Sequence, residues 1–242
     1  PTEAELRVLR PHADDLASYS AFLQQQRTGL VRLVSDSGCG DSTKVLATSA
    51  NCIAYPMPGH GSAYSFRVGN YRISRLSDLQ YADGNFVALG VLKHGMFVGI
   101  GDIPLENVTL NTSGLEPLNN FQPVEVVVKA VEVGRTLRDG REKGGYYYAQ
   151  EMRAVDSMTY VLRSVAYRGS VMRSVSGFVY DEMEFDKRRD VTVAFRIVRR
   201  HDDGGVTILW KELARKTAPL LLKRRESEPT RVNGNKFLAK EH

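Results

Sequence analysis

Two histidines and one aspartate come nearest to a catalytic or metal-binding set in this sequence. His60 and His94 lie in the N-terminal half, and Asp102 follows shortly after the second histidine. Imidazole and carboxylate groups move protons near neutral pH and bind zinc, so convergence of these three residues would indicate a hydrolase or a metal enzyme. Their spacing matches no short ligand motif such as HExxH. We therefore favour surface or turn histidines, and predict no catalytic residue, no metal site and no cofactor.

A second group of side chains combines arginines with aromatic rings. Arg67, Arg72 and Arg75 are interleaved with aromatic residues, among them Tyr71. Arginines bind phosphates and aromatic rings stack on bases, a combination that single-strand nucleic-acid binders present on a sheet. Any half-exposed sheet also alternates in this way, and that is the preferred explanation. The ligand-binding candidates are Arg67, Tyr71, Arg72 and Arg75.

Positive charge is concentrated in the C-terminal half. The chain has 33 Lys and Arg against 28 Asp and Glu, a formal net charge of +5. The densest basic set comprises residues 187–189 and the predicted basic face, which consists of Arg196, Arg199, Arg200, Lys223, Arg224 and Arg225. Such a face can bind nucleic acid through its phosphates, with an affinity that falls steeply with salt. Charge position alone specifies no partner, so nucleic acid is an alternative rather than the favoured partner.

The two cysteines, Cys39 and Cys52, lie in a segment rich in Gly, Ser and Thr. A disulfide between them would stabilise this segment by roughly 3 kcal/mol on chain-entropy grounds. Metal binding is less favoured, because the segment offers no histidine or further cysteine at ligand spacing. Disulfides persist in oxidising compartments, so the pair predicts a periplasmic, cell-surface or secreted protein. Two unrelated thiols in a cytoplasmic protein are the alternative.

Composition indicates a soluble globular protein. Apolar residues make up 42% and charged residues 25%, both usual values for folded domains. No apolar run approaches the roughly 20 residues of a membrane helix, so we predict no transmembrane segment. The chain begins with Pro1 rather than Met, so a signal peptide or lipid anchor could have been removed beforehand.

The clearest structural pattern lies between residues 190 and 211. Two runs that alternate apolar and polar residues flank the sequence Asp-Asp-Gly-Gly at 202–205. This pattern predicts a β-hairpin, because the turn requires residues that tolerate positive φ. A short helix is expected over 211–222, and a charged, poorly ordered tail over 223–242.

Weaker patterns organise the rest of the chain. Residues 13–23 have the apolar spacing of an amphipathic helix. Short alternating segments between 63 and 100 predict successive strands of an antiparallel meander. The Val-rich segment 124–133 is expected to be extended, with a short helix as the alternative. The polar residues 134–145 are the best position for a connector or boundary.

Together these patterns predict an α+β fold that is mainly antiparallel β. We expect a sheet meander or an open barrel or sandwich, with an N-terminal amphipathic helix and a C-terminal β-hairpin followed by a short helix. Residues 1–222 should form a single domain, with a possible subdivision near 134–145. We claim no resemblance to a known family.

The favoured function is a non-enzymatic binding or structural module of an exported protein, with an unknown protein or surface ligand as partner. One alternative is a nucleic-acid-binding protein that uses the basic C-terminal face. The other is a hydrolase or metal enzyme centred on His60, His94 and Asp102. Oligomeric state does not follow from any of these patterns.

Intact mass with and without thiol alkylation, measured under non-reducing conditions on protein from its native host, tests the disulfide. We expect Cys39 and Cys52 to resist alkylation and the mass to be lower by a pair of hydrogens. Alkylation of both thiols would remove the main support for export and would make nucleic-acid binding the next hypothesis to test.

Overall fold

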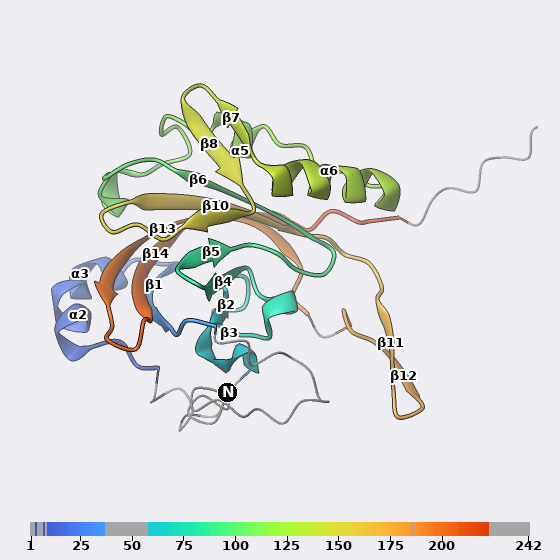
Figure 1. The fold of residues 1–242 in the computed structure, drawn as a ribbon, viewed down its shortest axis with the longest axis horizontal. Coiled ribbons are helices and arrows are strands. Elements are labelled where there is room, and N and C mark those ends of the chain that lie inside the picture. Colours follow the sequence, from blue (N-terminus) through green and yellow to red (C-terminus); the bar gives the residue numbers. More distant parts are fainter. Residues whose placement is uncertain (1–2, 4–6, 8, 37–57, 185, 223–242) are drawn as a thin grey trace, which may run out of the picture.

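Two antiparallel sheets form the body of the protein (Figure 1). The computed structural model describes residues 3, 7, 9–36, 58–184 and 186–222. The larger sheet has seven strands, in the order β1 (Thr28–Leu33), β14 (Val206–Thr217), β13 (Arg189–Arg200), β10 (Thr159–Ala166), β6 (Lys93–Gly99), β8 (Tyr146–Ala149) and β7 (Arg141–Lys143). The smaller sheet has five, in the order β3 (Asn70–Tyr71), β2 (Ala63–Ser65), β4 (Leu79–Ala82), β5 (Asn85–Val87) and β9 (Glu151–Arg153).

The remaining elements are short, apart from one helix. The α-helices are α2 (Ala13–Ser18), α3 (Ser20–Leu23), α5 (Glu116–Asn119) and α6 (Val127–Asp139). The 3₁₀ turns are η1 (Pro58–Gly61), η2 (Ser74–Leu76) and η3 (Leu105–Asn107). A separate ribbon of β11 (Met172–Val175) and β12 (Phe178–Asp181) projects from the body (Figure 1). The sheets are open, not closed into a barrel, so the predicted α+β, mainly antiparallel fold is confirmed.

Both faces of the larger sheet are covered by apolar packing. On one face the smaller sheet contributes Phe66 and Phe86, whose rings contact Phe195 of β13. On the other face, Phe22 of α3 and Leu137 of α6 belong to a second apolar cluster. Strands with two covered faces bury nearly every side chain, as β10 does along its whole length.

The predicted hairpin and N-terminal helix are confirmed. Strands β13 and β14 pair in antiparallel fashion, with Phe195 opposite Trp210, and the turn between them contains Gly204 at φ 78°. Positive φ is the conformation that glycine adopts without steric cost. Residues 13–23 form α2 and α3, which are separated at Tyr19.

The short helix expected over 211–222 is wrong, because β14 continues to Thr217. Thr192 pairs with Ala214 whereas the next residue, Val193, pairs with Glu212, so Leu213 is an extra residue in β14. This β-bulge shifts the alternation of apolar and polar side chains by one position. The sequence of β14 after Glu212 therefore lacks the regular alternation that predicts a strand. Pairing along β13 therefore determines the structure here.

The extended structure expected over 124–133 is also wrong, because α6 begins at Val127. Ala130 and Leu137 are the buried residues of α6, and they share one helical face at a spacing of seven. Packing of this face outweighs the preference of valine for strands. The helix continues through much of the polar connector at 134–145 and ends before Gly140, whose φ is 71°.

Only two hairpins of the predicted meander are correct, both in the smaller sheet, where β2 lies between β3 and β4. Strands β4 and β5 pair as expected, and so do β2 and β3. After β5, however, the chain crosses to the larger sheet, where β6 pairs with β10 and β8. Residues 223–242, the predicted tail, lie outside the described residues. Within the described residues, no helix is long and apolar enough to cross a membrane.

Gly95 of β6 lies close to the backbone of Ala88, in the segment that connects β5 to β6. A Cβ on Gly95 would lie 2.4 Å from the carbonyl oxygen of Ala88. We expect Gly95→Ala to lower the free energy of unfolding by about 1–3 kcal/mol, since the backbone must move to make room. Denaturant unfolding measures this loss.

Gly99→Ala, in the same strand, is the matched control. The nearest atom to a Cβ there is the sulfur of Met158, at 3.2 Å, and that side chain can move. Equal losses in the two variants would contradict the close approach at Gly95.

Candidate ligand-binding pocket

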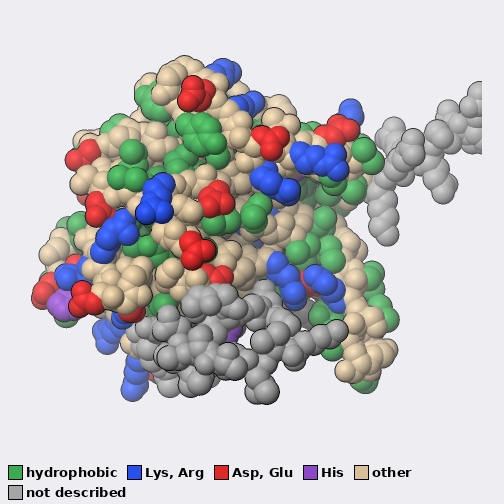
Figure 2. Space-filling view, in the orientation of Figure 1, with side chains coloured by type: hydrophobic (Ala, Val, Ile, Leu, Met, Phe, Trp, Pro, Cys, Tyr) green, Lys and Arg blue, Asp and Glu red, His purple; other side chains and the backbone are tan. Residues whose placement is uncertain are grey.

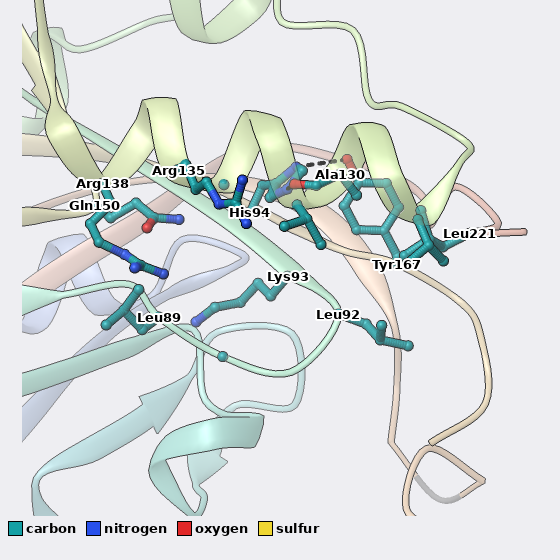
Figure 3. Close-up of a pocket in the computed structure, with 14 residues that line it drawn as sticks. Leu89, Leu92, Lys93, His94, Ala130, Arg135, Arg138, Gln150, Tyr167 and Leu221 are labelled. Carbon is teal, nitrogen blue, oxygen red and sulfur yellow. Dashed lines mark hydrogen bonds between the residues drawn. The ribbon is translucent and has the colours of Figure 1, made fainter. Parts of the chain in front are cut away.

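A pocket of about 450 Å³ lies between α6 and the segment that connects β5 to β6. Its polar lining is Lys93, His94, Arg135, Arg138 and Gln150, and its apolar lining includes Leu89, Leu92, Val127, Val131, Tyr167 and Leu221. In Figure 3, Lys93 points towards the end where Arg138 and Gln150 lie, and Tyr167, Leu92 and Leu221 lie at the other end. The pocket therefore has a cationic end and an apolar end.

The spacing of α6 places its pocket residues on one face. Val127, Val131, Gly134 and Arg138 follow one another at intervals of three and four residues, which align on a helix. A side chain at position 134 would fill space above the floor of the pocket, since its Cβ would lie 3.7 Å from His94 Nε2. Gly134 leaves this space open.

Backbone bonds from Gln150 hold the two walls together. Its N–H donates to the carbonyl of Leu137 in α6, at 3.1 Å, and its carbonyl accepts from Ala88 N, at 2.8 Å. Because Ala88 precedes the β5–β6 connection, these bonds set the distance between the helix and that connection.

His94 joins β6, α6 and the end of β10 at the floor of this pocket. Its Nε2 donates to the carbonyl of Ala130, at 2.8 Å, because a carbonyl can only accept. Its Nδ1 then accepts from the hydroxyl of Tyr167, at 2.9 Å. Burial lowers the pKa of His94, although the bond to Ala130 opposes this. The ring is thus a neutral structural link with both nitrogens occupied.

The other two members of the candidate catalytic set lie elsewhere. His60 lies in η1 with a φ of 47°, and Asp102 is an exposed residue that accepts from Arg196 Nη2 at 2.7 Å. Neither residue lines the pocket at His94. Among the described residues, no group of three or more His, Cys, Asp or Glu is arranged to hold a metal ion.

The candidate ligand-binding arginines near β3 are engaged within the protein. Arg67 and Tyr71 are buried, and the Tyr71 hydroxyl donates to the carbonyl of Arg32. Arg72 pairs with Asp186 at 3.4 Å, and Arg75 pairs with Glu182. Arg67 and Tyr71 are therefore not presented to solvent in this structure. Ligand binding by these four residues is not tested and stays a prediction.

Arg67 and Asp78 form the centre of a buried ion cluster below the pocket. Arg67 Nε donates to Asp78 Oδ1 at 2.7 Å, and its Nη1 donates to Asp186 Oδ2 at 3.1 Å. Ser164 of β10 also donates to Asp78, at 2.6 Å. Burial would raise the pKa of Asp78, but the charges of Arg67 and Lys93 and these hydrogen bonds hold it below its usual range.

Lys93 connects this ion cluster to the pocket. Its Nζ donates to the carbonyl of Ser77 at 2.7 Å and to that of Asp78 at 3.2 Å. Burial, together with the positive charges of Arg67 and Arg188, lowers the pKa of Lys93 to about 7, although Asp78 and Asp186 oppose the shift. The amine is therefore partly neutral at physiological pH.

Three of the four arginines of β13 pair with carboxylates. Arg196 pairs with Asp102 and Arg200 pairs with Asp156, both at 2.7 Å. Arg199 pairs with Asp15 of α2 at 2.6 Å. The other members of the predicted basic face, Lys223, Arg224 and Arg225, lie outside the described residues, as do Cys39 and Cys52.

Four polar residues of the pocket were not predicted from the sequence: Lys93, Arg135, Arg138 and Gln150. One usable signal was Lys93 at the start of the apolar run that continues in β6, since a lysine is seldom buried without a specific reason. The arginines of α6 were hidden because the helix itself was not predicted.

Comparisons with known proteins add no relative. A scan against models of protein families found no match, and neither did searches of curated proteins and of solved structures. The class of this protein is therefore defined by its own fold, an antiparallel β-rich α+β fold, and by its pocket.

Lys93 should make stability depend on pH. The folded protein releases this proton near pH 7, whereas the unfolded chain keeps it until about 10.5, so the unfolded state binds more protons between these values. Stability should therefore rise with pH across this window, by at most about 1.4 kcal/mol per pH unit. Urea unfolding at pH 7 and at pH 9 measures the slope, and Lys93→Met should abolish it.

The exposed Lys129 of α6 supplies the control, because Lys129→Met should keep the slope of the unsubstituted protein. A slope that survives in Lys93→Met would show that Lys93 is charged throughout this pH range.

Proposed function

We propose that this protein is a non-enzymatic binding module of an exported protein, and that its pocket holds a small molecule with an anionic group and an apolar part. The observation that carries the proposal is the division of one pocket into a cationic end and an apolar end. Its volume of about 450 Å³ lies within the usual range for small-molecule sites, about 300–1,000 Å³.

The arginines of α6 support an anionic ligand. Arg135 and Arg138 are exposed and form no ion pair with any described residue, unlike Arg196, Arg199 and Arg200 of β13. A guanidinium group binds a carboxylate or a phosphate through two parallel hydrogen bonds. These two side chains are thus available to an anion that enters from solvent.

Gln150 supports a ligand that also offers a hydrogen-bond donor. Its side chain is buried, and Oε1 has no hydrogen-bond partner among the described residues. A buried acceptor without a partner costs about 1–3 kcal/mol, which a ligand hydroxyl or amide would recover. This supports a ligand with a polar group near the cationic end.

The opposite end fits a hydrocarbon part. Leu92, Tyr167 and Leu221 line it, and Tyr167 is held in place by its bond to His94. Covering apolar surface contributes about 25 cal/mol for each Å² removed from water. A carboxylate that carries a short alkyl chain combines both requirements.

Two observations bear on the alternatives. The paired arginines of β13 offer little unopposed charge to nucleic acid, and His94 has no free ring nitrogen for proton transfer or metal binding. Export is proposed on the cysteine pair in the sequence, Cys39 and Cys52.

Decanoate is the probe for the pocket, because it joins a carboxylate to an apolar chain. We expect saturable binding in isothermal titration, and Arg138→Glu should weaken it about tenfold, the effect of a loss near 1.4 kcal/mol. The variant replaces an attraction by a repulsion on an exposed helix face, so the fold should be retained.

Arg141→Glu makes the same charge change on β7, outside the pocket, and should bind decanoate as the unsubstituted protein does. An equal loss in both variants would mean that net charge alone attracts the anion. That result, or no saturable binding at all, would overturn the proposal.

A further inference from the structure

The ribbon of β11 and β12 exposes apolar side chains far from the pocket. Phe178 is 79% exposed, Val179 66% and Val175 55%. Figure 2 shows hydrophobic side chains along the projecting ribbon, with Lys and Arg side chains on the body next to it. An isolated two-stranded ribbon has no core of its own, so these residues gain nothing for the fold by being apolar.

The apolar residues occupy both faces of the ribbon at its tip. Residues directly opposite each other in an antiparallel pair share a face. Val175 lies opposite Phe178 on one face, and Val179 lies opposite Ser174 on the other. The turn at Ser176 and Gly177 has positive φ at both positions, which is the tight type I′ arrangement.

Polarity increases from the tip towards the base. Tyr180 and Arg173 form the next pair, and Asp181 follows at the base, where its carboxylate accepts from the N–H groups of Val171 and Met183. Glu182 then pairs with both Arg173 and Arg75, which fastens the ribbon to the body. The exposed Met172, opposite Asp181, is an apolar exception at the base. The tip is thus apolar on both faces, and the charged side chains of the ribbon lie nearer its base.

A basic hollow lies at the base of the ribbon. It has a volume of about 280 Å³ and is lined by Arg168, Lys187, Arg188 and Arg189, with Asp186 as its acidic member. The Arg188 side chain is 4% exposed, and its Nη1 has no hydrogen-bond partner among the described residues. A buried guanidinium nitrogen without a partner requires an acceptor, which an anion would supply.

We propose that the ribbon docks this protein onto a bilayer that contains anionic phospholipid, with Val175, Phe178 and Val179 among the acyl chains and a lipid phosphate at the basic hollow. The apolar side chains at the tip would lie in the hydrocarbon of one leaflet, and the charged side chains nearer the base would lie among its headgroups. Tyr180 lies at the intermediate level, where tyrosine is favoured in membrane interfaces.

The two-faced tip favours a bilayer over a protein partner. A second copy or another protein that packs flat against the ribbon would cover one face and leave the other face in water. A bilayer surrounds an inserted tip on all sides, and the exposed Lys187 and Arg189 then face its negative surface.

Flotation of the full chain with vesicles tests the docking. We expect binding to vesicles of phosphatidylcholine and phosphatidylglycerol in equal parts, and a loss of at least tenfold in Phe178→Asp. Val128→Asp is the matched control, since Val128 is 56% exposed on α6 and lines neither the pocket nor the ribbon. Both positions are exposed, so thermal unfolding should be unchanged in either variant.

Fluorescence of Phe178→Trp distinguishes insertion from surface contact. Its emission should shift to shorter wavelength with vesicles and be quenched by lipids brominated on the acyl chains. The unsubstituted protein, whose Trp210 is only 7% exposed, supplies the background. No quenching, or dimerisation in vesicle-free buffer that Phe178→Asp alone abolishes, would overturn the proposal, the latter in favour of a second copy.

Charge reversal tests the basic hollow separately. Lys187→Glu should weaken binding to the mixed vesicles severalfold more than Lys143→Glu, which makes the same change on β7. Equal effects would show that only net charge attracts the membrane, and would overturn the phosphate site.

Discussion

The buried ion pair between Arg67 and Asp78 is the interaction on which the arrangement of the two sheets depends. A charge in the interior costs several kcal/mol unless a partner lies beside it, so neither residue is tolerable without the other. Both belong to the smaller sheet or its connections, while Ser164, which also bonds to Asp78, lies on β10 of the larger sheet. Apolar packing is non-directional. Directed bonds from one carboxylate to both sheets select a single position of one sheet over the other.

The pocket inherits its chemistry from this cluster. Arg67, Lys93 and Arg188 bring three positive charges into the interior, against the two carboxylates of Asp78 and Asp186. The surplus falls on Lys93, which is the most easily deprotonated of the three cations, and its side chain forms part of the pocket wall. The cluster that joins the sheets thus also sets the protonation of Lys93, while Arg135 and Arg138 of α6 supply the permanent positive charge at this end of the pocket.

Local patterns were sufficient for the hairpin but not for the site. Residues 190–211 were predicted correctly because a strand and its turn are specified by neighbours in sequence. The helix α6 was missed because packing outweighs the preference of its valines, and the end of β14 was missed because one bulge removes the alternation. Arg67 and Asp186 are separated by 119 positions, so nothing local indicates that they meet. The candidate site depends on such contacts.

The pairing of β1 with β14 has a consequence for biosynthesis. Strand β1 lies near the start of the chain, and its partner in the larger sheet is the last strand of the described residues, with Thr28 opposite Lys211. Strand β1 therefore stays without its partner until β14 has been synthesised. Closing so long a loop is slow compared with forming a local hairpin, so it should set the folding rate of the sheet.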